Sequence, residues 1–211
     1  MSTMFQMAGY SATEWSIGDL SNWDVSNVTD MAWMFNNAGY SSNVLNIGDL
    51  SNWDVSNVTD MYTMFQRTGY SATTFDIGDL SRWDVSRVID MEWMFNYAGF
   101  SAMTFNIGDL SNWDVSNVVN MGHMFNRYNE DTDEYSFNTT FNIGDISSWD
   151  VSKVTNMKRM FDGFGYNDSD YSLDLSSWSV PLVTIYTDFN KGVESKIIVP
   201  TWVNENVDTE G

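Results

Sequence analysis

The sequence contains no cysteine and only one histidine in 211 residues. The lack of cysteine excludes disulfide bonds, thiolate nucleophiles and zinc sites with cysteine ligands. A catalytic group of the Ser-His-Asp type would have to use His123, because it is the only imidazole in the chain. These absences argue against most enzymes that work through a nucleophile or a zinc ion.

Basic residues are also scarce. The chain has 9 lysines and arginines against 29 aspartates and glutamates, so its formal net charge is −20 at pH 7. This charge repels phosphate backbones and anionic lipid headgroups, so we expect no nucleic-acid partner. There is no apolar run of about 18 residues, so we expect no membrane insertion. Residues 1–10 lack the basic start and apolar stretch of a secretory leader, and we expect no signal peptide in this chain.

A repeat of about 30 residues dominates the sequence. The phrase Ile-Gly-Asp-Leu-Ser-Asn-Trp-Asp-Val-Ser-Asn-Val starts, with small changes, at Ile17, Ile47, Ile77, Ile107 and Ile143. A period of this size is typical of a unit that buries its apolar face only by stacking on its neighbours. We expect residues 1–180 to form a solenoid of about six repeats, the first of them partial. A capping segment at 181–203 and a polar tail at 204–211 would follow.

Each unit is predicted to contain one short parallel strand and one short helix. The segment 50–55 has the spacing of a leucine-rich-repeat strand, with Trp53 facing the core and Asp54 facing solvent. The segment 61–68 carries apolar residues at helical spacing and is followed by Gly69, a common helix stop. The predicted fold class is therefore an α/β, leucine-rich-repeat-like solenoid with a C-terminal cap.

Aromatic residues recur at the same period and are predicted to form two columns. The first column is expected to be buried core and contains Trp23, Trp53, Trp83, Trp113, Trp149 and Trp178. The second is expected to pack between adjacent units, with sugar binding as the alternative, and contains Tyr10, Tyr40, Tyr70 and Phe100.

A fourteen-residue string connects the repeat to a known family. The string Asn-Trp-Asp-Val-Ser-Asn-Val-Thr-Asp-Met-x-x-Met-Phe occurs at 22–35 and 52–65, and variants start at Arg82, Asn112 and Ser148. It closely resembles the BspA-like repeat of bacterial surface proteins, also known as the DUF285 repeat. The resemblance covers about residues 1–180 and implies a leucine-rich-repeat-type solenoid with a role in adhesion or protein binding.

From these features we expect a non-enzymatic binding or adhesion module. It would present a rigid acidic surface to a protein or glycan partner, outside the cell at a cell or virion surface. The alternative is a structural subunit or segment of a larger assembly, with self-association through the open N-terminal repeat. Catalysis is disfavoured because pairs of carboxylates recur in every unit, whereas a catalytic pair is expected once.

Two rows of aspartates are the first candidate sites. The first row is predicted to bind a partner and contains Asp24, Asp54, Asp84, Asp114 and Asp150. The second row follows the turn glycines and is the candidate metal set, with Asp19, Asp49, Asp79, Asp109 and Asp145. We expect first-row carboxylates to accept hydrogen bonds from the serine two residues on. No cofactor is required, and calcium, which binds several oxygen ligands, is the alternative.

Departures from the repeat are the second set of candidates, because stacking does not explain them. An insertion at 126–140 adds six residues to one unit and protrudes as an acidic loop. Its candidate binding residues are Asp131, Asp133 and Glu134. Variable positions on the predicted helices supply Trp33, Tyr62 and Trp93, which either form an aromatic contact patch or cover the return loops.

Overall fold

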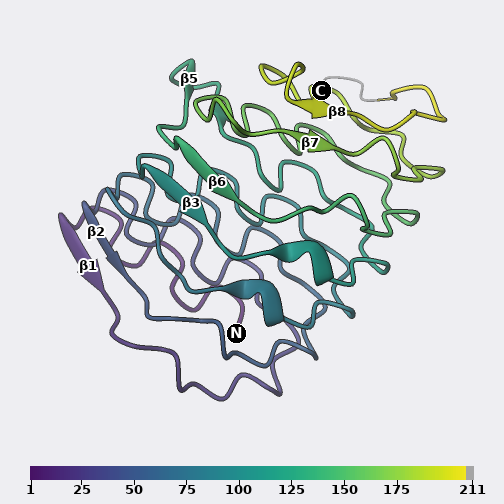
Figure 1. Ribbon diagram of the computed structural model, residues 1–211. Coiled ribbons are helices and arrows are strands. Elements are labelled where there is room, and N and C mark those ends of the chain that lie inside the picture. The colour runs from purple at the N-terminus through teal and green to yellow at the C-terminus, as the bar shows by residue number, and fades with distance from the viewer. Residues whose placement is uncertain (208–211) are drawn as a thin grey trace.

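The computed structural model describes residues 1–207, in which the chain winds as a stack of parallel coils (Figure 1). Equivalent positions of successive repeats lie next to each other on neighbouring coils. Parallel bridges mark this register through most of the stack and join Asp30, Asp60, Asp90, Asn120, Asn156 and Ile185 in that order. Residues one repeat apart in the sequence are therefore neighbours in space.

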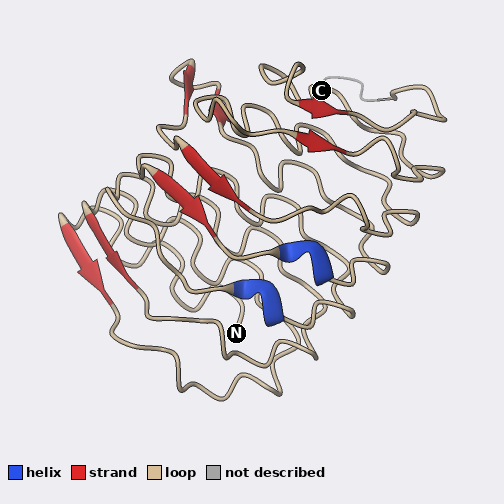
Figure 2. Cartoon of the chain, viewed as in Figure 1, coloured by secondary structure: helices blue, strands red, loops and turns tan. Residues whose placement is uncertain are grey.

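Regular secondary structure is sparse and short (Figure 2). Three parallel pairs join neighbouring coils: β1 (Glu14–Ser16) with β2 (Val44–Asn46), β3 (Thr104–Asn106) with β6 (Thr140–Asn142), and β7 (Leu173–Asp174) with β8 (Ile197–Ile198). The insertion forms an antiparallel hairpin of β4 (Tyr128–Asn129) and β5 (Glu134–Tyr135). Two single 3-10 turns complete the set, η1 (Leu80–Arg82) and η2 (Leu110–Asn112). Among residues 1–207, no helix is long and apolar enough to cross a membrane.

The predicted helix in each repeat is wrong, and with it the α/β fold class. Segments such as 31–40 and 61–70 run as successive turns, and residues 1–207 contain no α-helix. Trp33 has a φ of 61°, in the left-handed region, which interrupts a right-handed helical series. Its N–H donates to the carbonyl of Tyr62 on the next coil at 2.9 Å instead of continuing a helix. Bonds between coils thus replace bonds along a helix.

The predicted strand position is also wrong. The strands lie before the segment equivalent to 50–55, at positions such as Val44–Asn46, and the segment itself begins with a turn or a 3-10 turn and continues as irregular chain. The predicted alternation of side chains within it is confirmed, because Trp53 is 3 % exposed and Asp54 is exposed. Inward and outward alternation therefore does not by itself require a paired strand.

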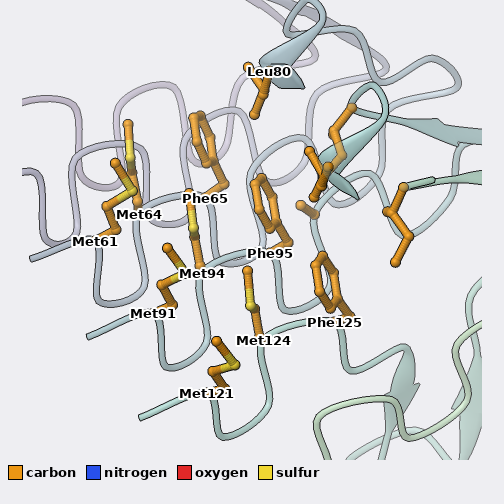
Figure 3. Packing of buried hydrophobic residues seen from close by; sticks show 14 of the residues in the cluster. Met61, Met64, Phe65, Leu80, Met91, Met94, Phe95, Met121, Met124 and Phe125 are labelled. Carbon is orange, nitrogen blue, oxygen red and sulfur yellow. The ribbon is translucent and has the colours of Figure 1, made fainter. Parts of the chain in front are cut away.

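Stacked side chains form one continuous core along the coils. Figure 3 shows equivalent methionines and phenylalanines of three coils in parallel rows, for example Phe65, Phe95 and Phe125. The rings of Phe65 and Phe95 lie 5.5 Å apart and are nearly parallel. Burying each such ring stabilises the fold by about 1.5–3 kcal/mol. The apolar positions read as a helix face are thus buried, although no helix carries them.

The tryptophan column is buried as predicted from Trp53 onward, whereas Trp23 is 37 % exposed. Each buried indole also makes a bond to the preceding coil: Trp83 Nε1 donates to the carbonyl of Leu50 at 3.0 Å. The rings of Trp113 and Trp149 lie 6.3 Å apart and are stacked. Each indole therefore contributes both apolar area and a directional link between coils.

Residues after β8 fold back over the last coil. Trp202 stacks on Tyr186 at 4.3 Å. Asn204 Nδ2 donates to the carbonyls of Pro181 and Val183, both at 2.9 Å. The polar tail predicted at 204–211 is described only as far as residue 207, and its last four residues lie outside the described part of the chain.

Candidate functional site

The first aspartate row lies along one edge of the coils. Ser56 donates from its N–H and its Oγ to Asp54 Oδ1, at 3.1 and 2.6 Å. The backbone bond recurs at Asp24, Asp84, Asp114 and Asp150 at 3.0–3.1 Å. The expected bond from the serine two residues on is confirmed. Each of these carboxylates is consequently held in one orientation relative to its coil.

The second row is held in the same way and also contacts the next coil. Ser51 N–H donates to Asp49 Oδ1 at 2.9 Å. A Cβ added at Gly78, whose φ is 88°, would lie 2.0 Å from that oxygen. A glycine is therefore required there both by its backbone conformation and by the close approach of the aspartate. We refer to the two rows together, Asp24, Asp54, Asp84, Asp114 and Asp150 with Asp19, Asp49, Asp79, Asp109 and Asp145, as the aspartate ridge.

Hydrogen bonds lower the pKa of several ridge carboxylates, Asp54 and Asp79 among them. The Ser56 hydroxyl and then its N–H lower the pKa of Asp54, and burial is too small to reverse this. The pKa of Asp79 is lowered by the N–H and then the side chain of Ser81. Because a hydrogen bond to the charged form favours it, these carboxylates stay negative well below neutral pH.

The structure does not assemble the second row into a metal cage. Each carboxylate sits in its own turn beside its own serine. Among residues 1–207, no three histidine, aspartate or glutamate side chains are grouped so that they suit a metal ion. The calcium alternative for Asp19, Asp49, Asp79, Asp109 and Asp145 therefore gains no geometric support from this region.

The insertion folds as the β4–β5 hairpin and lies across several coils. Asp131 forms an ion pair with Arg67 at 3.5 Å, and Asp133 accepts a hydrogen bond from the Tyr128 hydroxyl at 2.5 Å. Glu134 lies in β5 opposite Asn129. The carboxylates of the predicted binding residues Asp131 and Asp133 thus have partners within the chain. Asp131 attaches the hairpin to a coil, and Asp133 stabilises the hairpin itself.

Tyr135 anchors the hairpin in a slot between two glycines. Its ring stacks on Tyr166 at 3.7 Å, nearly parallel. A Cβ at Gly163 would lie 2.6 Å from Tyr135 Cδ1, and a Cβ at Gly192 would lie 2.4 Å from the hydroxyl. The slot exists because these two positions carry no side chain, so the docking geometry is specific to Tyr135.

A hollow lies beside the hairpin. It has a volume of ≈ 460 Å³ and is lined by Trp93, Tyr97, His123, Asn126, Glu130, Lys158 and Arg159. The Trp93 and His123 rings stack at 3.8 Å. Of these residues, sequence reasoning selected Trp93 as a binding residue and missed Tyr97. A signal was present in the sequence: position 97 carries tyrosine, whereas the equivalent positions of the two neighbouring repeats carry arginine, Arg67 and Arg127.

The three predicted aromatic contact residues do not form one patch. Trp33 and Tyr62 meet edge to face at 5.3 Å, whereas Trp93 pairs with His123. All three lie on turns of the coils rather than on the predicted helices. The aromatic surface is therefore divided, and its Trp93 half belongs to the hollow.

The second aromatic column is stacked as predicted. Ring centroids are 4.8 Å apart for Tyr10 and Tyr40, 4.8 Å for Tyr40 and Tyr70, and 4.7 Å for Tyr70 and Phe100. Each inner ring has both faces covered by its neighbours. The column therefore offers ring edges to solvent and cannot receive a sugar on the faces of Tyr40 and Tyr70.

Comparison with known proteins gives one result. The family model described as a Mycoplasma protein of unknown function, DUF285, matches residues 1–135 and 70–202. Neither the curated proteins nor the solved structures give a match. The two matched stretches span the stacked coils, the hairpin and the residues that fold back after β8. The chain thus belongs to the DUF285 family.

Proposed function

We propose that this protein is a non-enzymatic binding module that presents the aspartate ridge to a partner protein with a basic surface. The observation that supports this is the fixed orientation of the ridge carboxylates, each bonded through Oδ1 to the serine two residues on. A rigid row of like charges attracts a surface of opposite charge and raises the rate of association. The net charge of −20 acts in the same direction at longer range.

A protein partner is favoured over a glycan by the aromatic columns. Sugars pack on open ring faces, and the faces of Tyr40 and Tyr70 are covered by their neighbours. Catalysis is disfavoured because the ridge carboxylates recur from coil to coil, whereas a catalytic pair is expected once. The resemblance of the repeat to that of bacterial surface proteins supports a location outside the cell, at a cell or virion surface.

The test measures binding of the whole chain to a panel of extracellular proteins at about 0.05 M and about 0.5 M salt. A triple variant, Asp54→Asn, Asp84→Asn and Asp114→Asn, removes charge while keeping each turn. Asparagine retains the accepting oxygen, as Asn46 Oδ1 accepts from the Gly48 N–H at 3.3 Å. We expect association to a basic partner to slow at least about tenfold in this variant and in high salt.

The matched control removes three exposed charges away from the ridge: Glu14→Gln, Asp170→Asn and Glu194→Gln. It changes the net charge by the same amount and should bind nearly as the wild type does. Equal binding by the ridge variant and the wild type would contradict the proposal. So would a chain that binds neutral glycans on an array and no protein of the panel.

A further inference from the structure

One arginine joins the hairpin to the coils. Arg159 Nη2 lies 2.5 Å from Glu130 Oε1 on the hairpin and 3.0 Å from Asp188 Oδ2 on the next coil. Its Nε lies 3.9 Å from Asp162 Oδ2. The Arg159 side chain is 13 % exposed. Three carboxylates therefore share a guanidinium that solvent scarcely reaches, and Asp188 also pairs with Lys191 Nζ at 3.4 Å.

Asp162 is the weakly satisfied member of this group. It is fully buried, and neither Oδ1 nor Oδ2 has a hydrogen-bond partner. The equivalent residues of the two preceding coils are Asn96 and Asn126, which are neutral. Burial raises the pKa of Asp162 to about 7, and the nearby Arg159 opposes this only in part. A neutral Asp162 costs much less in this place than an ionised carboxylate without hydrogen bonds, which is strongly unfavourable.

Charged and titratable groups reach Asp162 from every segment packed around it. They are Arg159 on its own coil, Asp188 and Lys191 on the next coil, Glu130, Tyr128 and Tyr135 on the hairpin, and Tyr97 on an earlier coil. Burial raises the pKa of Tyr97 to about 12, and the bond to Asp133 raises that of Tyr128 to about 12, so both stay neutral. The bond from Arg159 lowers the pKa of Glu130, which stays ionised.

We propose that protonated Asp162 latches the hairpin onto the coils, and that ionisation of Asp162 releases it. In the latched state Tyr135 fills the glycine slot and Glu130 holds Arg159. An ionised Asp162 needs either the guanidinium, which must then leave Glu130, or water, which enters when the hairpin lifts. Both responses weaken the docking, and lifting also removes the Glu130 wall of the hollow.

The sign of the pH dependence follows from the two states of Asp162. When the hairpin is lifted, Asp162 meets water and its pKa returns towards 3.8. Docking is then strongest below that pH and weakens about tenfold for each pH unit until the pKa of the docked state, about 7, is passed. Glu130 works in the opposite direction, but only below its ordinary value of 4.5. The latch therefore operates between weakly acidic and neutral pH.

Hydrogen exchange of the whole chain measures the latch. Mass spectrometry of the peptide spanning 126–137 gives the protection of the hairpin amides after correction for intrinsic exchange. In the wild type we expect protection to fall roughly a hundredfold between about pH 5 and about pH 7. In Asp162→Asn, which places at 162 the residue type already present at Asn126, protection should stay constant. The matched variant Asp170→Asn changes an exposed aspartate and should behave as the wild type.

His123 supplies the second control, because imidazoles ordinarily titrate near neutral pH and this one lines the hollow. His123→Gln should retain the full pH dependence. The proposal is overturned if wild-type protection is flat across this range, if Asp162→Asn keeps the decline, or if His123→Gln abolishes it. Should Asp162→Asn fail to fold, the wild type and His123→Gln still decide, since both must show the decline.

Discussion

Replacing Gly78 with alanine tests the contact between neighbouring coils. Gly78 has a φ of 88°, and the left-handed region costs an alanine about 1–2 kcal/mol. The new Cβ would also lie 2.0 Å from Asp49 Oδ1 on the preceding coil, so that the carboxylate must move away from the Ser51 N–H. Losing this hydrogen bond costs about 0.5–1.5 kcal/mol. We expect Gly78→Ala to lower the free energy of unfolding by about 1.5–3.5 kcal/mol.

Gly18 provides the matched control for this substitution. Its φ is 82°, and a Cβ added there would meet nothing within 4 Å. Gly18→Ala should therefore cost only the conformational part, about 1–2 kcal/mol. Urea unfolding followed by circular dichroism measures both variants, and for a chain of this size each kcal/mol lowers Tm by about 2–4 °C.

A double variant separates the two contributions to the cost at Gly78. With Asp49→Ala in place the obstructing oxygen is gone, and the Leu50 backbone nitrogen lies 3.1 Å from the new Cβ, so Gly78→Ala should cost only slightly more than Gly18→Ala does in the wild type. If Gly78→Ala and Gly18→Ala cost the same in the wild-type chain, or if Asp49→Ala does not relieve the loss, the reasoning about close approach between coils is refuted.

Three further predictions concern stability. Asp162→Asn should raise the free energy of unfolding at pH 8 by up to about 4 kcal/mol and hardly change it at pH 4. The figure is the difference between a pKa of 3.8 in the unfolded chain and about 7 in the folded chain, at about 1.36 kcal/mol per pH unit. Urea titrations at both pH values check this. Trp83→Phe removes the donor to the Leu50 carbonyl and should cost about 1–3 kcal/mol in the same assay, whereas no loss would show that water replaces the indole. The lowered pKa values of ridge residues such as Asp54 contribute stability that is complete above 3.8 and is lost as pH falls through the folded values, so Tm should drop in acid. The triple ridge variant should show a smaller drop.

The sequence predicts the period of the fold and the direction of its side chains. The spacing of the tryptophans places equivalent residues side by side, and the buried Trp53 next to the exposed Asp54 follows from alternation alone. The same reasoning identifies the serine that holds each first-row aspartate, since Ser56 bonds to Asp54 within a single turn. Short-range chemistry of this kind depends on neighbouring residues and is visible in any one repeat.

The predicted helix failed because its pattern has a second physical solution. Met61, Met64 and Phe65 are buried as a helix face would be, yet they lie on successive turns. Those turns need left-handed residues at Thr63 and Arg67, with φ of 54° and 55°. Neither residue type favours that region, so nothing local signals it. The conformation is supported by bonds to the next coil, such as Thr63 N–H to the Glu92 carbonyl at 2.9 Å, which no single repeat reveals.

The candidate site likewise has a part that the sequence predicts and a part that only the structure shows. The insertion and its acidic residues stand out from the repeat, and Trp93 was found as a variable position. The ion pair between Glu130 and Arg159 and the burial of Asp162 depend on how a non-repeating loop folds back over the coils. Repeat spacing has no rule for such a loop. Its partners were therefore beyond sequence reasoning.

The hairpin also couples the number of coils to its own attachment. Stacked repeats ordinarily tolerate gain or loss of a module, because each one touches only its neighbours. Here one loop is fastened at two distant places, to Arg67 through Asp131 and to Arg159 through Glu130. Deleting the single module 77–106 would leave a continuous stack of coils, yet it would shift Arg67 relative to the loop and break that ion pair. The two ion pairs of the hairpin can therefore form together only when the number of coils between Arg67 and Arg159 is the one seen here.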